Sequence, residues 1–312
     1  MTGLVEAAHS APPDLASGET HRRGLLAVLA DYWTLTKPEV NFLVVASTLA
    51  GFDAGSRGPL DWVRLAHTLM GTLLVASGTG TLNQFIERRH DARMRRTSNR
   101  PLPAGRLASS HALGFGILLS LAGGLELLLA VNVLASALAL ATLASYLVLY
   151  TPLKRRTPLC TLVGAFPGAM PPLIGWAAAR GSLSLEAWVL YAILFLWQFP
   201  HFLAIAWMYR EDYTRAGLQM LPSRDVEQGR LTRREIFAFT LALVPVSLIP
   251  VFLGHAGSIY FVGTLAAGLG FLACAARLLF SRSNVLARRV VLASVAYLPL
   301  VLALLIVDKI PG

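Results

Sequence analysis

Long apolar segments alternate with short polar ones along almost the whole chain after residue 37. Read with a window of about twenty residues, this pattern predicts membrane-spanning helices. The expected spans are nine, at about 38–55, 65–87, 108–130, 131–150, 160–179, 185–209, 235–254, 257–280 and 288–307. Helices are expected because lipid offers no hydrogen-bond partners to an open backbone. Prolines within these spans predict kinks, at positions 167, 171, 172, 200 and 245.

Composition agrees with a membrane protein. The chain is 55% hydrophobic and 14% charged, whereas roughly a quarter of the residues in a soluble domain are charged. A net charge of +10 would suggest nucleic acid as the partner of a soluble protein. In a membrane protein it reflects topology instead, so the expected surroundings are a lipid bilayer and no nucleic acid.

The basic residues gather on one side of the predicted membrane. Of the 27 Lys and Arg residues, 22 lie in the N-terminal segment and in loops 88–107, 151–159, 210–234 and 281–289. Cytoplasmic loops carry such an excess. We therefore expect a cytoplasmic N-terminus and an outer C-terminus, which agrees with an odd number of spans.

Two parts of the chain are expected. Residues 1–30 are polar and lack the short apolar core of a signal peptide, so they are predicted to form a disordered cytosolic tail. Residues 31–312 are predicted to form one nine-helix transmembrane domain. Cys160 and Cys274 both lie in apolar runs, which supports neither a disulfide framework nor a metal cluster.

Polar groups with a regular spacing mark the end of the second span. Asn83, Glu87 and Asp91 are four residues apart and therefore share one helix face. The stripe is about 12 Å long, too long for one ion to touch both ends. It suits Mg²⁺ ions that share phosphate oxygens with a ligand. The alternative is an ordinary helix end in which Glu87 and Asp91 pair with Arg95 or Arg96.

Cations that could hold an anion follow this stripe. Arg95, Arg96 and Arg100 come directly after it, and arginine forks match phosphate oxygens. Lys154 and Arg155, in "YTPLKRRTPLC", could reach the same anion. Positive-inside topology is the competing interpretation, and it is preferred for Arg88, Arg89 and Arg106.

A second polar face follows the sixth span, in "WQFPHFLAIAWMYREDYTRAGLQMLP". His201, Ile205, Met208 and Asp212 share a helix face. Asp212 is the stronger candidate for a site, with Glu211 beside it. Gln198 and His201 are polar groups in an apolar span, and such groups usually face a bundle interior or a cavity. A purely structural role remains open for His201.

These motifs resemble a known family. N-x3-E-x3-D-x2-M-x-R-T-x2-R-P-L-P, from Asn83 to Pro103, is similar to the first acidic motif of UbiA-type intramembrane prenyltransferases. The blocks "LTKPEV", "YTPLKRRT", "GAMPPLIGW", "WQFPHF" and "DYTRAGLQMLP" resemble, in order, the subfamily that farnesylates protohaem IX. The resemblance covers about residues 30–307. Two departures stand out: Glu87 replaces a common Asp, and Asp212-Tyr213 replaces two aspartates spaced by four.

The resemblance implies an all-α bundle of nine helices with its site at the cytoplasmic face of a bacterial plasma (inner) membrane. Mg²⁺ is the implied cofactor, held with farnesyl diphosphate by Asn83, Glu87, Asp91 and Asp212. The implied cations at the diphosphate are Lys37, Arg95, Arg100, Lys154 and Arg155. Haem b is the implied acceptor substrate, converted to haem O by addition of farnesyl and water at a vinyl group.

His201, Gln198 and Tyr213 are the hypothesised contacts on the haem side. A haem A synthase or oxidase assembly proteins are the candidate protein partners.

Two alternatives compete with this interpretation. A prenyltransferase for another aromatic or quinone-precursor acceptor would share the diphosphate site, and the "WQFPHF" block argues against it. A secondary transporter would place its titratable groups near the bilayer centre. Here the acids lie at one membrane face beside arginines, which favours a diphosphate.

Overall fold

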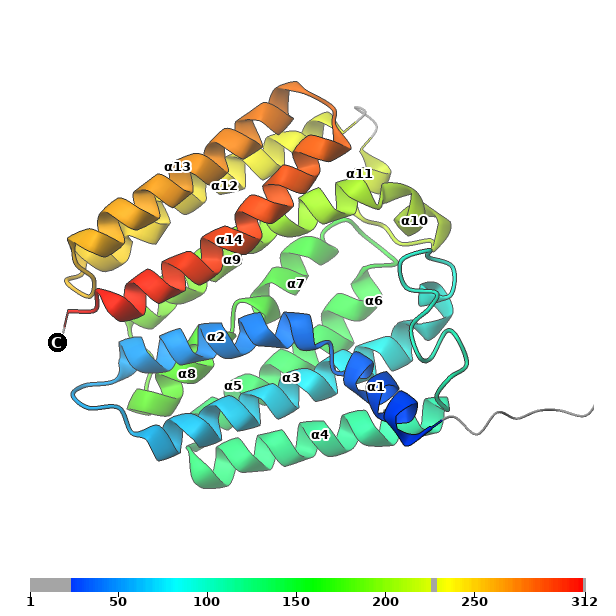
Figure 1. The fold of residues 1–312 in the computed structure, drawn as a ribbon, viewed down its shortest axis with the longest axis horizontal. Coiled ribbons are helices and arrows are strands. Elements are labelled where there is room, and N and C mark those ends of the chain that lie inside the picture. The colour runs from blue at the N-terminus through cyan, green and yellow to red at the C-terminus, as the bar shows by residue number, and fades with distance from the viewer. Residues whose placement is uncertain (1–23, 226–228, 311–312) are drawn as a thin grey trace, which may run out of the picture.

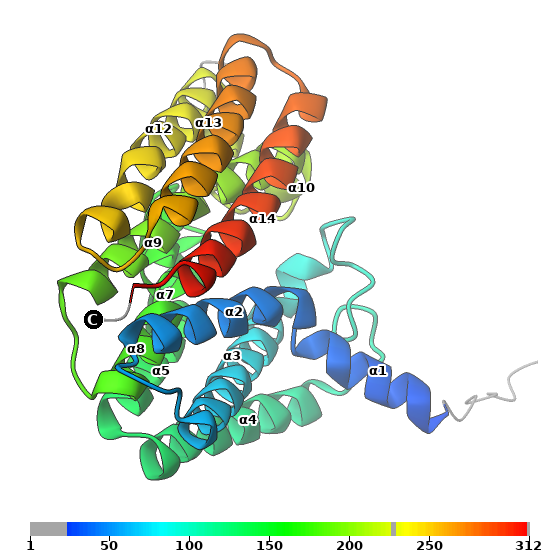
Figure 2. The ribbon, with the colours of Figure 1, turned by 60° about the vertical axis from the view of Figure 1, so that its left-hand side comes forward.

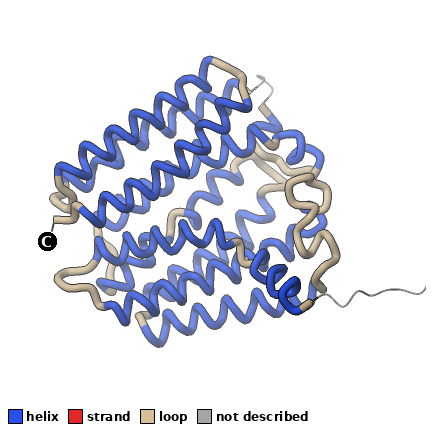
Figure 3. The backbone as a smooth tube through the Cα atoms, in the orientation of Figure 1, coloured by secondary structure: helices blue, strands red, loops and turns tan. Residues whose placement is uncertain are grey.

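The computed structural model describes residues 24–225 and 229–310, and within these ranges it contains helices and loops but no named strand (Figure 3). The helices that form the main body are α2 (Pro38–Gly55), α3 (Trp62–Asp91), α4 (Ser109–Ala130), α5 (Val133–Ala144), α7 (Cys160–Gly168), α8 (Pro171–Arg180), α9 (Leu185–Met208), α12 (Arg230–Phe252), α13 (Ser258–Phe280) and α14 (Asn284–Val307). Shorter helical segments are α1 (Leu25–Leu35), the π-helical η1 (Ser145–Tyr150), α6 (Thr151–Leu153), α10 (Arg210–Arg215) and α11 (Leu221–Arg224).

Helices cover all nine segments expected from the apolar pattern, with ends shifted by a few residues. Seven helical segments of the described chain are long and apolar enough to cross a membrane: 109–130, 133–153, 160–180, 185–208, 230–252, 258–280 and 284–307. α2 and α3 are outside this group, and both carry buried polar side chains. The chain is therefore an integral membrane protein, and the two further spans stay a prediction.

α1 begins at Leu25, before the domain boundary expected at residue 31, and that boundary stays a prediction. Leu25, Leu26, Leu29 and Trp33 of this helix are exposed. Leu35 is fully buried, and Asp31 accepts a hydrogen bond from Arg106 at 2.8 Å. The rest of the predicted tail, residues 1–23, lies outside the described residues.

The helices form two groups (Figures 1 and 2). α9, α12, α13 and α14 pack together on one side, while α2, α3, α4, α5 and α8 pack on the other. The 92–108 loop, α10 and α11 lie at one end of the bundle, and the described C-terminal residues lie at the opposite end (Figure 1). Functional groups from distant parts of the sequence therefore meet at the loop-rich end.

Proline breaks one of the predicted spans. α7 ends at Gly168 and α8 begins at Pro171, which lacks the N–H that would continue the helix. Pro200 and Pro245 instead lie inside helices that continue past them. The break at residues 169–170 faces the space between the two groups of helices, since Gly168 and Pro171 line the cavity described below.

Glycine permits very close packing of α2 on α8. A methyl group at Gly51 would overlap the carbonyl oxygen of Pro172, and one at Gly175 would overlap the carbonyl oxygen of Thr48. Small residues at such contacts let helix backbones approach closely in a membrane. This contact holds the wall of the cavity in place.

Gly51→Ala should therefore lower the free energy of unfolding by about 1–3 kcal/mol, because the added methyl group overpacks this contact. Gly270→Ala is the matched control, since a methyl group there meets open space. Thermal unfolding in detergent, followed by circular dichroism, measures both. Equal melting temperatures for the two variants would contradict the close packing of α2 on α8.

Candidate active site

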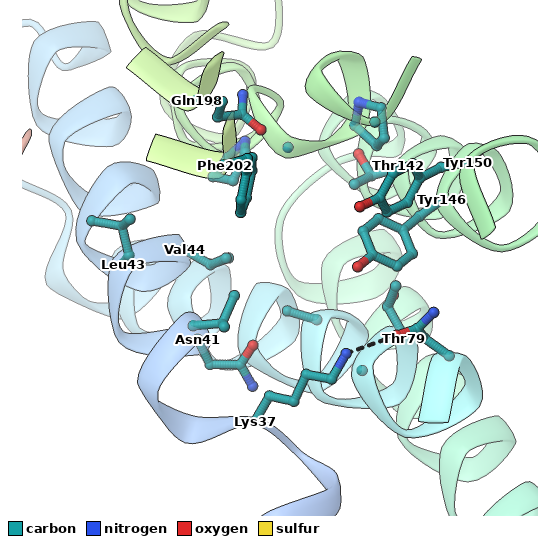
Figure 4. A pocket seen from close by; sticks show the side chains of 18 of the residues that line it. Lys37, Asn41, Leu43, Val44, Thr79, Thr142, Tyr146, Tyr150, Gln198 and Phe202 are labelled. Atoms are coloured by element: carbon teal, nitrogen blue, oxygen red, sulfur yellow. Dashed lines mark hydrogen bonds between the residues drawn. The ribbon is translucent and has the colours of Figure 1, made fainter. Parts of the chain in front are cut away.

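A cavity of about 380 Å³ lies between the two groups of helices (Figure 4). One part of its wall is ionic, with side chains of Lys37, Asn83, Glu87, Asp91, Arg100 and Lys154. Most of the remaining wall is apolar, including Val44, Val75, Ile174, Leu194 and Leu298. The cavity can therefore receive a ligand with an anionic head and a hydrocarbon body.

The predicted stripe on α3 faces this cavity. α3 stays helical to Asp91, so Asn83, Glu87 and Asp91 keep the spacing of four residues that puts them on one face. All three line the cavity. This placement agrees with the prediction that the three side chains share one helix face.

Lys37 reaches the stripe from the start of α2. Its backbone has φ = 55°, and it is the one non-glycine residue with positive φ in the described chain. Such conformations are costly and gather at functional sites. The turn brings the Lys37 ammonium to the Asn83 side-chain oxygen at 2.8 Å. Burial, reinforced by the nearby positive charges of Arg100 and Lys154, lowers the pKa of Lys37 to about 7.

Two hydrogen-bonding side chains hold this strained turn. The Gln84 amide donates to the backbone oxygens of Thr34 and Leu35, at 3.3 and 3.0 Å. The Asn41 amide donates to the oxygen of Thr36 at 2.8 Å. Buried backbone oxygens are thereby satisfied, so the turn keeps one conformation.

Glu87 and Lys154 form a buried ion pair. Their charged atoms are 3.0 Å apart, and each side chain is 13% exposed. Burial acts to lower the pKa of Lys154, but the negative charge of Glu87 outweighs it and the pKa lies well above its ordinary value. Asn83 also donates to Glu87, at 3.0 Å. The carboxylate is thus fixed by two partners.

Asp91 pairs with Arg100, at 2.8 Å. The sequence alternative, in which the acids pair with Arg95 or Arg96, is wrong for both acids. The chain turns sharply after Asp91, where the Thr97 hydroxyl donates to the Asp91 backbone oxygen at 2.8 Å. That turn returns Arg100 to the stripe and leaves Arg95 and Arg96 exposed.

Other predicted residues are placed differently. Gln198 and Tyr213 line the cavity. Asp212 is buried but pairs with Arg215 at 2.9 Å. His201 contacts the Ser294 hydroxyl at 2.8 Å and stacks on Trp197. Four of the predicted site residues do not line the cavity: Asp212, His201, Arg95 and Arg155. The two arginines are exposed.

Sequence reasoning missed the aromatic wall of the cavity. Tyr146 and Tyr150, in η1, line it beside Lys154, and the Lys154 ammonium lies 4.5 Å from the centre of the Tyr150 ring. Thr142, Tyr146, Tyr150 and Lys154 repeat every four residues. The four-residue spacing can be read from the sequence. The long apolar run around these residues, however, predicted only a membrane span.

Residues 44–301 of the chain match the UbiA prenyltransferase family. The chain belongs to this family. It is 52% identical to the protoheme IX farnesyltransferase of Solibacter usitatus, over 91% of the chain and all of the relative. It is 45% identical to the protoheme IX farnesyltransferase of Koribacter versatilis, over 92% of the chain and 96% of the relative.

Solved structures of UbiA proteins share the fold. A digeranylgeranylglyceryl phosphate synthase superposes with a TM-score of 0.73 at 19% identity, covering 90% of this chain and 98% of that one. A UbiA homolog from Archaeoglobus fulgidus bound to GPP and Mg²⁺ superposes with a TM-score of 0.60 at 16% identity, covering 88% and 99%. At such identities the likeness establishes the arrangement of helices.

The oxygen ligands of this UbiA site suit a metal ion that a diphosphate also binds. They suit less well a metal ion that is held by protein side chains alone. Among the described residues, no group of three or more His, Cys, Asp and Glu side chains is close enough to hold a metal. Asn83, Glu87 and Asp91 nonetheless present oxygen ligands along the ionic wall. Mg²⁺ takes one or two carboxylates and completes its shell with phosphate oxygens and water, which this stripe can supply with a bound diphosphate.

Glu87→Ala should lower the free energy of unfolding by about 3–5 kcal/mol, because it leaves the Lys154 charge buried without its partner. The double variant Glu87→Leu/Lys154→Met removes both charges and should recover most of that loss. Thermal unfolding in detergent measures the difference. A double variant that is no more stable than Glu87→Ala would show that the two charges do not depend on each other.

Proposed function

We propose that this chain transfers the farnesyl group of farnesyl diphosphate to a vinyl group of haem b, giving haem O. The observation that carries this proposal is one cavity with an ionic wall and a long apolar wall. The relatives named protoheme IX farnesyltransferase support the choice of substrates, because their likeness covers more than nine tenths of the chain.

The ionic wall suits a diphosphate held with Mg²⁺. Arg100 is paired with Asp91, and Lys154 is paired with Glu87. A diphosphate can replace the two carboxylates as the partner of Arg100 and Lys154. Glu87, Asp91 and Asn83 can then bind Mg²⁺. Mg²⁺, when bound there, stabilises negative charge on the departing diphosphate. The UbiA homolog bound to GPP and Mg²⁺ supports this pairing of ligands.

Asp212, Arg95 and Arg155 complete the proposed site at its edge. Asp212 joins the metal-binding residues only if it releases Arg215, with which it pairs. Arg95 and Arg155 are exposed, so they attract the anion through solvent and contact it only after their side chains move. Attraction of this kind raises the local concentration of a charged ligand.

The reaction needs the carbon–oxygen bond at C1 of the farnesyl group to break, which leaves an allylic cation and free diphosphate. Lys37, Arg100 and Lys154 stabilise the diphosphate as its charge grows, since they are already placed in a poorly solvated site. The apolar wall keeps bulk water from the cation. The π electrons of a haem b vinyl group then form a bond between its outer carbon and C1. Water adds to the inner vinyl carbon and gives up one proton to the diphosphate, which completes haem O.

Haem is proposed to lie against α9, across the cavity from the ionic wall. Gln198 and Tyr213 line the cavity and can reach a ligand there. His201 is turned to Ser294 on α14, so it contacts haem only if that hydrogen bond breaks. A haem A synthase or oxidase assembly proteins are proposed as the receivers of the product.

The charge bias of the loops supports a cytoplasmic site in a bacterial plasma membrane. Residues 92–108 and 209–225 are rich in arginine and lie at the same end of the bundle. By the positive-inside rule this end faces the cytoplasm. The N-terminus would then be cytoplasmic and the C-terminus outside.

Purified protein incubated with haem b, farnesyl diphosphate and Mg²⁺ should form haem O, identified by its mass, and a chelator should stop the reaction. A parallel incubation replaces haem b with a hydroxybenzoate. Prenylated benzoate without haem O would replace the haem proposal by the second acceptor class. No prenylated product from either acceptor would reject the transferase.

Arg100→Ala should raise the KM for farnesyl diphosphate by about tenfold or more, because a hydrogen bond to a charged group is lost. Arg89→Ala is the control, since Arg89 is exposed and does not line the cavity. Steady-state kinetics with haem b held constant measures both values. An equal KM for the two variants would remove Arg100 from the diphosphate site.

A further inference from the structure

Gln198 is a buried amide that the diphosphate chemistry does not use. It lies in the middle of α9, is 4% exposed and lines the cavity. Its nitrogen donates to the backbone oxygens of Ala165 and Leu194, both at 3.1 Å. An amide nitrogen has two hydrogens, so both are in use.

These two bonds fix the direction of the amide oxygen. Carbonyl oxygens can only accept hydrogen bonds, so the nitrogen must face them and the oxygen must face the other way. The amide oxygen accepts no hydrogen bond from any side chain or backbone group in the described ranges. Figure 4 shows it on the cavity side, across from Lys37.

The chain makes room for this oxygen at Gly168. A methyl group at Gly168 would overlap it, so the glycine in α7 lets the amide lie against the helix backbone. The cavity is also lined by the hydroxyls of Ser47, Thr72 and Thr161, which have no hydrogen-bond partner among the described residues, but other hydroxyls are satisfied within their own helices. The Thr79 and Thr142 hydroxyls, for example, donate to Val75 and Leu138 at 2.8 and 2.7 Å.

Gln198 also lies at the depth of the ionic wall. It precedes the end of α9 at Met208 by ten residues, or about 15 Å of helix. Asn83 precedes the end of α3 at Asp91 by eight residues, or about 12 Å. Both helices end at the loop-rich end of the bundle (Figure 1). In the proposed complex, the amide oxygen would therefore lie across the cavity from the carbon that loses the diphosphate.

The proposed reaction needs a hydrogen-bond acceptor at this place. Bond formation between C1 and the outer vinyl carbon leaves positive charge on the inner vinyl carbon. That carbon can lose a neighbouring proton to give an alkene, or bond to the oxygen of water to give an alcohol. An apolar cavity excludes bulk water, so the second outcome requires one water molecule to be held in position.

We propose that the Gln198 amide oxygen holds this water molecule. The water donates one hydrogen to the amide and directs a lone pair at the inner vinyl carbon. When the new carbon–oxygen bond forms, the water loses one proton to the released diphosphate, and Gln198 keeps its own hydrogens. The inference rests on the proposed function, because it concerns the last step of the same reaction.

The ratio of alcohol to alkene among the prenylated haems tests this role directly. Gln198→Leu removes the acceptor and should lower that ratio by about tenfold, the effect of losing one strong hydrogen bond. Gln198→Glu keeps an acceptor oxygen and should retain more of the alcohol than Gln198→Leu. Mass spectrometry separates the two products, which differ by one water. Since a ratio does not depend on the amount of active enzyme, partly folded preparations still report it.

A second variant leaves Gln198 intact and displaces it. Gly168→Ala pushes the amide oxygen out of its position and should lower the ratio in the same direction. Gly270→Ala, where a methyl group meets open space, and Thr142→Val, whose hydroxyl serves its own helix, should both keep the wild-type ratio.

The outcomes separate the two proposals. Wild-type protein that forms no prenylated haem rejects the proposed function. Wild-type protein that forms the alcohol, with an unchanged ratio in Gln198→Leu and Gly168→Ala, rejects the role of Gln198 alone. Wild-type protein that forms only the alkene also rejects that role.

Discussion

The pairing of buried cations with the carboxylates of α3 is the interaction on which the site depends. Glu87 and Asp91 carry their carboxylates into the bundle, where Lys154 and Arg100 balance the charges. The same four side chains that neutralise one another are those that the proposed metal ion and diphosphate would use. Under that proposal, stability and ligand affinity arise from one set of charges, and substrate binding would exchange partners instead of creating new buried charge.

The same need for charged groups in the interior affects the composition of two helices. α2 and α3 carry polar groups into the interior and are less apolar than their neighbours, which is why they fall outside the seven clear spans. The strained Lys37 turn and the break between α7 and α8 both border the cavity. Regular helices supply the apolar wall and the acids of α3, while the Lys37 turn and the loop after Asp91 supply cations. The fold thus separates the two halves of an amphipathic substrate.

Much of this arrangement follows from the sequence, because apolar run length and a spacing of four residues are local properties. They predicted the helical segments and the face shared by Asn83, Glu87 and Asp91. Partner choice is not local: the turn after Asp91 brings back Arg100 instead of Arg95, and η1 turns Tyr146 and Tyr150 to the cavity. Spacing predicted one helix face for His201 and Asp212, but α9 ends at Met208, between the two residues. Their contacts with Ser294 and Arg215 depend on side-chain packing.

The exchange of partners makes Mg²⁺ and diphosphate depend on each other, and binding calorimetry measures that dependence most directly. Each ligand titrated alone must break the ion pairs without replacing them, so we expect weak binding. Titrated in the presence of the other, each should bind at least about tenfold more tightly, and by the same factor, because coupling between two ligands is reciprocal. Equal affinities with and without the second ligand would contradict the exchange.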